Sequence, residues 1–578
     1  MWSAEFREQI FHKLSESEHD VVIIGGGIAG AGIFRDAVMR GLDAVLLEKR
    51  DFASGTTAGS TKMAHGGIRY LPQLEFPLLI EALRERDIIT TLAPHLAREI
   101  AFIYPIYHGD KGGVPLIKTG MFLYDFLDYI GNLFLFDRHG SITNYLRFYL
   151  SKKRHKMLKP DEVLKHLPKL RKDGLIGGAM YYDCQIDPER LCLENILDGI
   201  HRGGTAVNYA RCIKLLRGEG KVVGVVVKDE ITGEEYQVIG KQVINAAGPW
   251  CDEIRHLYDA AFQNKIRGSK GIHLFVKKFT DHAAALPTED KRAFFVIPWY
   301  DFSLVGTTDT DYDGSLDEIP TTREDTRMLL HEINRAFPEL NLKPEDVIYS
   351  YARVRPLVTA RADRYSRIKN AIRRPGKRTS AISRKHEIFD HTEIEGFISV
   401  SGVKITSYRD AAQQVVDIVQ RKIGRRTPCL TYKTPFFPEL HGSYEKVEEF
   451  IKTAVPAETA RYGVERETIE LLIRNYGTRF REILALTEEN PTWKEKICAH
   501  HPDILAQIVH AARNELAVTP GDFLLRRCLI GRSKCLGLDC VETAAKTMGG
   551  ILGWTEQQRK TQIENYRSEV QRTLQIQS

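Results

Sequence analysis

The sequence predicts an α/β protein that also contains an antiparallel-sheet domain and ends in a separate α-helical domain. A β-branched run at residues 21–24 precedes a glycine-rich turn and a helical stretch, which is typical of a buried parallel strand leading into a helix. Residues 205–247 and about 270–310 have the composition of successive strands. From about residue 430 the chain has helical periodicity and many charges, with expected breaks at Pro456, Gly477, Pro491, Pro502 and Pro520.

Length and composition fit a soluble globular protein with more than one folding unit. A single core rarely grows beyond about 250–300 residues, whereas this chain has 578, of which 43% are hydrophobic and 27% are charged. Its net charge of +6 fits an anionic substrate or an acidic membrane surface. Because the chain has no basic stripe with interleaved aromatic residues, we expect no nucleic-acid partner.

Cysteine usage and apolar runs bear on the location of the protein. Nine cysteines at irregular spacing favour a reducing compartment over a disulfide framework, so we expect a cytoplasmic protein. Residues 1–20 lack the apolar segment of a secretory signal. No uninterrupted apolar run reaches about 18 residues, so we expect no transmembrane helix.

The glycine-rich turn predicts a dinucleotide site. Gly25, Gly27 and Gly30 form G-x-G-x-x-G between the first strand and the helix, where they allow a tight turn and close approach of a pyrophosphate. Glu48 ends the second strand, 18 residues after Gly30, where its carboxylate can accept hydrogen bonds from ribose hydroxyls. A glycine-rich turn without a ligand would leave Glu48 unexplained. We therefore predict a Rossmann-type domain, although the motif alone fits FAD and NAD equally.

Two later turns favour FAD. Gly248 follows the strand that ends at residue 247, and Gly402 follows the strand at residues 397–400. Flavoproteins of this kind assemble the FAD site from several remote segments.

Several motifs resemble the FAD-dependent glycerol-3-phosphate dehydrogenases. The similarity runs in order from about residue 18 to 415, and residues 514–515 and 522–527 are similar to the family's C-terminal helical cap. Two features depart from the family pattern. The segment 359–379 is longer and more basic than in the simplest bacterial members, and Val403 stands where the family usually has a second glycine. The motifs that carry the resemblance are residues 48–51, 60–62, 65–71, 181–184, 297–299, 306–309, 354–357 and 402–409.

The resemblance implies a domain division. We expect an oxidoreductase core at 18–425 and a helical cap at 426–578. Within the core, we assign about 18–75, 150–265 and 350–425 to FAD binding and about 76–149 and 266–349 to the substrate domain.

The resemblance also implies site residues. Oxidation of a secondary alcohol needs a base for the hydroxyl proton and a clamp for the phosphate. His273, in the segment 270–273, is the expected base; without the resemblance it would be a structural histidine on a strand. The expected substrate-binding residues are Arg69, Tyr70, Arg355, Arg384 and Lys404, with Arg355 and Lys404 also acting in catalysis. Ser60 and Lys62 are expected at the FAD pyrophosphate or the flavin edge, and Gly248 and Gly402 complete the FAD-binding set.

The implied reaction is oxidation of sn-glycerol 3-phosphate to dihydroxyacetone phosphate, with electrons passed from FAD to quinone. The alternatives are a glycerol-3-phosphate oxidase that uses oxygen, an amine or amino-acid oxidase, and a non-catalytic FAD subunit that relays electrons. The family resemblance also implies peripheral association with the inner face of the cytoplasmic membrane. The oligomeric state stays open, with a homodimer as one option.

Two further signals carry less weight. The aromatic-rich segment 117–136 fits either a membrane contact or a buried helix. Cys528, Cys535 and Cys540 match no standard metal pattern and lack a fourth ligand, and His500–His501 does not change this. We therefore expect free thiols and no metal site.

Overall fold

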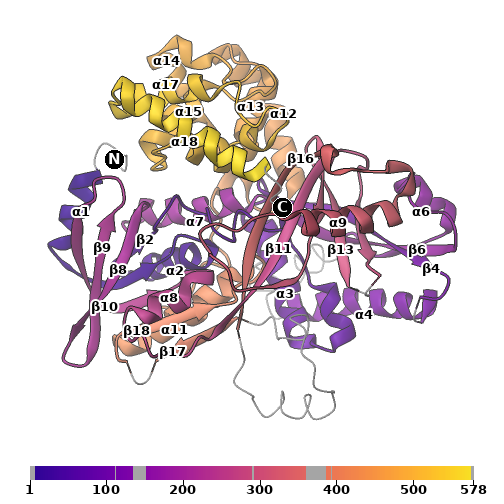
Figure 1. Ribbon diagram of the computed structural model, residues 1–578, viewed down its shortest axis with the longest axis horizontal. Helices are drawn as coiled ribbons and strands as arrows, with labels where there is room; N and C mark the ends of the chain where they lie inside the picture. The colour runs from indigo at the N-terminus through magenta and orange to yellow at the C-terminus, as the bar shows by residue number, and fades with distance from the viewer. Residues whose placement is uncertain are drawn as a thin grey trace.

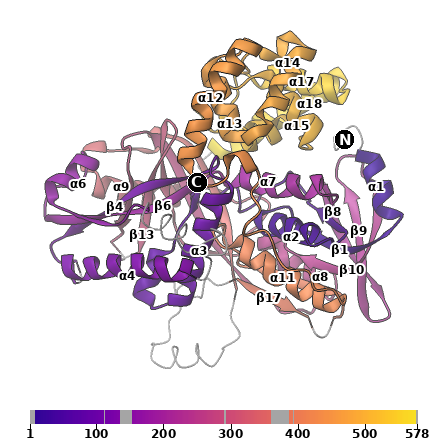
Figure 2. The same cartoon turned by 180° about the vertical axis from the view of Figure 1, so that it is seen from behind.

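The predicted fold class is confirmed by a computed structural model, which describes residues 7–110, 112–133, 152–289, 292–358, 386–391 and 394–574. Two sheets lie side by side, and the C-terminal helices, coloured orange to yellow, sit together above them (Figure 1). The view from behind shows the same arrangement (Figure 2).

The first sheet carries the predicted dinucleotide turn. Its central strands run parallel in the order β18-β10-β1-β2-β7, while β17 is antiparallel at one edge and β8 and β9 extend from β10. Helices α2, α7 and α11 pack against one another beside this sheet and share its apolar core. Burial on both faces explains why residues 21–24 of β1 form a continuous apolar run. The bounds are β1 (Glu18–Ile24), α2 (Ile28–Met39), β2 (Ala44–Leu47), α7 (Pro188–His201), β7 (Thr205–Val207), β8 (Ala210–Gly218), β9 (Lys221–Asp229), β10 (Glu235–Asn245), β17 (Glu387–Asp390), β18 (Phe397–Ser401) and α11 (Tyr408–Lys422).

The second sheet is mostly antiparallel, as predicted. Its strand order is β15-β11-β14-β13-β12-β4-β6-β3, and in addition β16 pairs with β11 and β5 pairs with β6. Among the described strands of this sheet, β12 and β4 form a parallel pair. Helix α9 (Arg323–Ala336) covers part of it with Leu329, Leu330 and Ile333. The strand bounds are β3 (Met63–Ala64), β4 (Ala97–Tyr107), β5 (Lys156–Leu158), β6 (Leu175–Ile186), β11 (Ile266–Lys277), β12 (Ala283–Pro287), β13 (Ala293–Trp299), β14 (Phe302–Gly306), β15 (Thr310–Tyr312) and β16 (Val347–Val358).

Sheet membership differs from the segment boundaries expected from the sequence. Strands β5 and β6 fall within 150–265, and most of β16 falls within 350–425, yet all three belong to the second sheet. The reason is long-range pairing: β6 runs along β4 from Ala97↔Ile186 to Tyr107↔Leu175. A local pattern of apolar residues predicts a strand but does not name its partner.

The C-terminal helical domain is called the cap below. One of its helices, α12, continues through a proline where the sequence predicted a break. Pro456 lies inside α12, so the predicted break there is wrong. A proline inside a helix costs about 3 kcal/mol, but α12 buries Ile451 and Val455 before Pro456 and Tyr462 after it. The other breaks fall between helices or at a helix start. The cap helices are α12 (Tyr444–Tyr462), α13 (Arg466–Tyr476), α14 (Phe480–Glu489), α15 (Leu505–Asn514), α16 (Pro520–Arg526), α17 (Val541–Leu552) and α18 (Glu556–Leu574).

The aromatic-rich segment forms α4 (Gly113–Leu133), which packs on α3 (Phe76–Leu92). Tyr124 and Leu127 are buried against α3, whereas Phe122 and Phe126 are exposed. Within the described ranges, every helix is too short or too polar to cross a bilayer.

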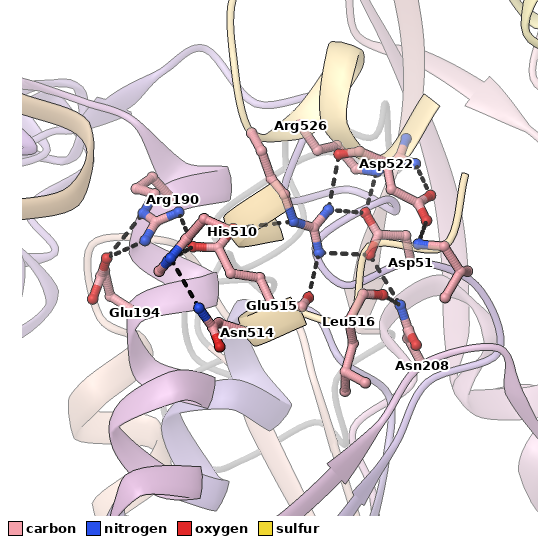
Figure 3. Close-up of polar contacts among 12 residues, drawn as sticks. Asp51, Arg190, Glu194, Asn208, His510, Asn514, Glu515, Leu516, Asp522 and Arg526 are labelled. Carbon is pink, nitrogen blue, oxygen red and sulfur yellow. Dashed lines mark hydrogen bonds and ion pairs between the residues drawn. The ribbon is translucent and has the colours of Figure 1, made fainter. Parts of the chain in front are cut away.

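Buried ion pairs join the cap to the first sheet (Figure 3). Asp51, three residues after Glu48, accepts hydrogen bonds from Arg526 Nε at 2.6 Å and from Arg527 Nη1 at 2.8 Å. Although burial opposes ionisation, the charges of Arg527 and Arg526 hold the pKa of Asp51 below its ordinary value. Nearby, Arg190 of α7 pairs with Glu515 of the cap at 2.7 Å. The cap is therefore attached directly to the loop that follows β2.

Neutralising Asp51 is expected to destabilise the folded protein. Asp51→Asn removes the carboxylate that Arg526 and Arg527 share and leaves Arg526 with Asp522 and Arg527 with Glu515, so the free energy of unfolding should fall by about 3–5 kcal/mol. Urea unfolding measures this change. The control is Glu395→Gln, which removes the exposed pair between Lys221 and Glu395 and should cost at most about 1 kcal/mol. Equal losses in the two variants would contradict the structural role of Asp51.

Candidate active site

A cavity of about 370 Å³ opens where the two sheets meet. Its walls come from the carboxyl ends of β1, β2, β10 and β18 in the first sheet and from β11 and β16 in the second. Ligands of open parallel sheets bind outside the carboxyl ends of the strands. The predicted site residues that line the cavity are Gly25, Gly27, Glu48, Ser60, Gly248, His273, Arg355, Gly402 and Lys404.

The glycine turn leaves room for a closely approaching ligand. A Cβ atom at Gly30 would lie 1.9 Å from the carbonyl oxygen of Gly25, so the turn closes only with glycine there. Helix α2 starts just after Gly27, which has no side chain to cap it. The N–H of Ile28 donates to Oγ1 of Thr57 at 3.1 Å, and the N–H groups that follow it can bind an anion. These features suit the pyrophosphate of a dinucleotide.

Glu48 supports the turn as well as lining the cavity. Its carboxylate accepts hydrogen bonds from the backbone N–H of Gly26 at 2.6 Å and of Arg50 at 2.9 Å. Burial raises the pKa of Glu48 above its ordinary value. Each carboxylate oxygen still has acceptor capacity for ribose hydroxyls.

Strands β11 and β16 present their functional side chains on one face. The antiparallel register pairs Ser269 with Arg355 and His273 with Tyr351. Directly opposite residues share a face, and residues two or four positions apart along a strand share it too. His273, Arg353 and Arg355 therefore all point into the cavity, where all three are found.

His273 has the properties of a neutral base. Its Nε2 lies 3.0 Å from Oγ1 of Thr61, another cavity-lining residue. Burial, together with the positive charges of Arg355 and Lys62, holds the pKa of His273 well below its ordinary value. The imidazole is thus uncharged near neutral pH and can accept a proton.

Arg355 is held rigidly in the cavity wall. Its Nη2 donates to Oγ1 of Thr307 at 2.6 Å, and both terminal nitrogens donate to the carbonyl of Thr308 at 3.1 Å. A Cβ atom at Gly271 would lie 2.2 Å from Nη2 of Arg355, so glycine leaves the guanidinium its place. A fixed, partly exposed guanidinium suits an anionic group.

Lys404 and Tyr70 lie together, but only Lys404 lines the cavity. The ammonium of Lys404 is 4.5 Å from the centroid of the Tyr70 ring, and Tyr70 is buried. Arg69 belongs to the adjoining turn η2 (Ile68–Gln73); its side chain lies outside the described residues, as do Arg384 and the basic stretch 359–379.

Lys62 does not line the cavity, in contrast to its expected role at the cofactor. Its side chain is fully buried, donates to the carbonyl of Ala58 at 2.8 Å and forms an ion pair with Glu189. Arg532 of the cap also pairs with Glu189, at 2.6 Å. Burial lowers the pKa of Lys62 to about 8, with the charge of Glu189 opposing the shift.

Sequence reasoning missed Arg353 and Thr61. Arg353 donates from Nε to the carbonyl of Gly55 at 3.3 Å and lines the cavity two residues before Arg355. Alternation along a strand with Arg355 on the cavity face would have indicated Arg353. Thr61 gave no comparable signal, because its role depends on its contact with His273, 212 positions away.

Two family models match the chain. Residues 20–403 match the family described as FAD dependent oxidoreductase, and residues 439–559 match the C-terminal domain of alpha-glycerophosphate oxidase. The protein therefore belongs to the FAD-dependent oxidoreductases, which confirms FAD as its cofactor.

Individual relatives narrow this class. The glycerol-3-phosphate dehydrogenase of Synechocystis sp. is 35% identical over 577 residues, covering 96% of this chain and 97% of the relative. The aerobic glycerol-3-phosphate dehydrogenase of Bacillus subtilis is 33% identical over 533 residues, covering 90% and 89%. The solved Bacillus halodurans glycerol-3-phosphate dehydrogenase, complexed with FAD, superposes with a TM-score of 0.79 at 28% identity, covering 100% of this chain and 99% of that one. The chain belongs to the glycerol-3-phosphate dehydrogenase family.

Adding one methyl group to the glycine turn should abolish cofactor binding. In Gly30→Ala the new Cβ meets the Gly25 carbonyl, and the turn must open. We expect purified Gly30→Ala to contain at most a tenth of the FAD per chain found in the unaltered protein, measured by visible absorbance.

The matched control is Gly550→Ala in helix α17, where a Cβ meets nothing within 4 Å. It should retain full FAD. Normal FAD content in Gly30→Ala would rule out this turn as the pyrophosphate site.

Proposed function

We propose that this protein oxidises sn-glycerol 3-phosphate to dihydroxyacetone phosphate and passes the electrons to quinone. The observation that carries the proposal is the shared cavity: neutral His273 and the cations Arg355 and Lys404 line the same space as the dinucleotide turn. The names of the Synechocystis and Bacillus relatives support the same substrate.

Each residue has a defined task in this reaction. Arg355 and Lys404 bind the phosphate dianion and orient the alcohol, because positioning supplies much of the rate. Nε2 of His273 accepts the proton of the secondary hydroxyl, which takes the place of the Thr61 hydroxyl that contacts this nitrogen at 3.0 Å. Bound FAD supplies the acceptor for the two electrons and the hydrogen on the carbinol carbon.

Anaerobic mixing with glycerol 3-phosphate tests the substrate. The visible flavin absorption should bleach with this substrate and persist with amino acids. Bleaching by amino acids alone would favour an amine or amino-acid oxidase, and no bleaching would favour an electron-relay subunit. Either result overturns the proposal.

Replacing His273 should slow this bleaching without loss of FAD. His273→Asn removes the proton acceptor, so the first-order rate of flavin reduction should fall about 10²–10⁴-fold. Stopped-flow absorbance measures the rate, and the FAD content of each variant checks folding. The control His331→Asn alters an exposed histidine in α9 and should leave the rate unchanged. An unchanged rate in His273→Asn would remove it as the base.

The pH dependence should report the low pKa of His273. For kcat/KM, activity requires the neutral imidazole, so the acid limb should lie below the ordinary histidine value of about 6.5. Arg355→Gln removes a positive charge that lowers this pKa, and the limb should move to higher pH. The exposed Arg461→Gln is the control and should leave the limb in place. A limb that does not move in Arg355→Gln would contradict the electrostatic link.

An apolar surface on and beside α4 supports delivery of electrons to quinone in a membrane. Leu74, Leu116, Phe122 and Phe126 are 66%, 57%, 67% and 48% exposed. At about 100° per residue, the three positions on α4 fall within an arc of about 120°. Both views place α4 on the side of the molecule away from the cap (Figures 1 and 2). Exposed aromatic residues on one helix face suit the interface of a bilayer.

The inner face of the cytoplasmic membrane fits this surface. All nine cysteines are free thiols, which suits a reducing compartment.

A vesicle assay tests membrane association and the electron acceptor together. Phe122→Ser/Phe126→Ser should weaken binding to anionic phospholipid vesicles at least about tenfold, since burying one aromatic side chain contributes about 1.5–3 kcal/mol. The rate of quinone reduction in the vesicles should fall together with vesicle binding, while the rate at which substrate bleaches the flavin stays unchanged. Ile231→Ser, at an exposed turn of the first sheet, is the control. Peroxide formed in equal amount to the oxidised substrate would identify an oxidase instead.

A further inference from the structure

A cluster of thiols lies in the cap, away from the FAD cavity. Cys528, Cys535 and Cys540 lie close together in the sequence, but in the structure Cys498 joins the cluster and Cys528 lies outside it. Cys498, from the loop before α15, lies with its sulfur 3.8 Å from the sulfur of Cys535. The Cys528 sulfur instead lies 3.6 Å from the carbonyl of Leu524.

An acidic side chain completes the cluster. Oδ2 of Asp539 lies 3.5 Å from the sulfur of Cys498. The Cys540 sulfur lies within 4.8 Å of both the Cys498 sulfur and an Asp539 oxygen. The sulfurs of Cys498 and Cys540 and an Asp539 oxygen therefore lie within 4.8 Å of one another, and the Cys535 sulfur adjoins this group at Cys498.

Part of the cluster has the spacing of a tetrahedral zinc site. With Zn–S bonds of about 2.3 Å and a Zn–O bond of about 2.0 Å, ligand atoms lie about 3.8 Å apart for two sulfurs and about 3.5 Å apart for sulfur and oxygen. The Cys498 sulfur has these separations from the Cys535 sulfur and from Oδ2 of Asp539. The Cys535 sulfur lies outside the group of three, so its side chain would turn toward the metal on binding.

The surroundings also suit metal-bound thiolates. The N–H of His500 donates to the Cys498 sulfur at 3.4 Å, and the Ser533 hydroxyl lies 3.1 Å from the Cys535 sulfur. Hydrogen bonds of this kind orient and stabilise metal ligands. Cys498 and Cys540 are buried, while Asp539 is exposed and gives a metal ion access.

We infer that Cys498, Cys535, Asp539 and Cys540 form a structural zinc site. On binding, the three thiols release their protons to solvent, and four protein ligands close the coordination shell, as in structural rather than catalytic sites. This site revises the expectation of free thiols without a metal.

The site would join two loops of the cap at the place where the cap packs on the second sheet. The 533–540 segment is a series of turns without regular helix or strand, so a metal cross-link gives it a defined shape. Ile497 and Cys498 belong to the same apolar cluster as Ile297 and Trp299 of β13. A metal at Cys498 therefore ties the cap's docking loop to the start of α17.

Metal analysis of the full-length protein tests the site. Protein purified under reducing conditions without chelator should carry about one zinc per chain. Cys498→Ser and Cys540→Ser should each lose nearly all of it. Cys528→Ala, in the same region but outside the site, should keep it. FAD content in each variant checks that the core has folded, and this readout does not depend on the proposed activity.

Substitution with Co²⁺ gives a second measurement on the unaltered protein. A tetrahedral thiolate site should produce a sulfur-to-metal charge-transfer band and strong visible bands. Chelation of zinc should lower the melting temperature of the unaltered protein but not that of Cys498→Ser. Absence of bound zinc together with absence of the Co²⁺ bands would overturn the inference. So would an intact mass two hydrogens lighter without reductant, which would identify a Cys498–Cys535 disulfide instead.

Discussion

The antiparallel pairing of β11 with β16 is the constraint on which the active site depends. The pairing runs from Ile266↔Val358 to beyond His273↔Tyr351, so backbone hydrogen bonds fix where the imidazole and the guanidinium of Arg355 stand relative to each other. A slip of one residue would turn either side chain to the opposite face of the sheet. The proposed proton acceptor and phosphate clamp are therefore positioned by paired strands rather than by flexible loops.

Local patterns predicted what depends on local physics. The strand, glycine turn, helix and Glu48 were predictable because their geometry is set within about 30 residues. His273 and Arg355 were identified only through family resemblance, since no local pattern shows that their strands pair. The orientation of Lys62 was not predictable, because it depends on Glu189 and on Arg532, which lies far along the chain. The proposed zinc site could not be predicted for the same reason: Cys498 is remote in sequence from its partners.

Charge has opposite effects in the core and at the cap interface. In the cavity, burial and the positive charges of Arg355 and Lys62 lower the pKa of His273 and keep its imidazole neutral. At the interface, Asp51 and Glu189 each pair with two basic groups, so the charge of each carboxylate is compensated on burial. The same residue types thus create a binding site in one place and a permanent joint in the other.

The pairing of Arg532 with Glu189 limits how this architecture can evolve. Glu189 shares its carboxylate between Arg532 of the cap and Lys62, whose charge in turn acts on His273. Replacement of the C-terminal helices by an unrelated domain would leave this carboxylate with Lys62 alone and change the charges that act on His273. We therefore expect the core and the cap to be inherited as one unit.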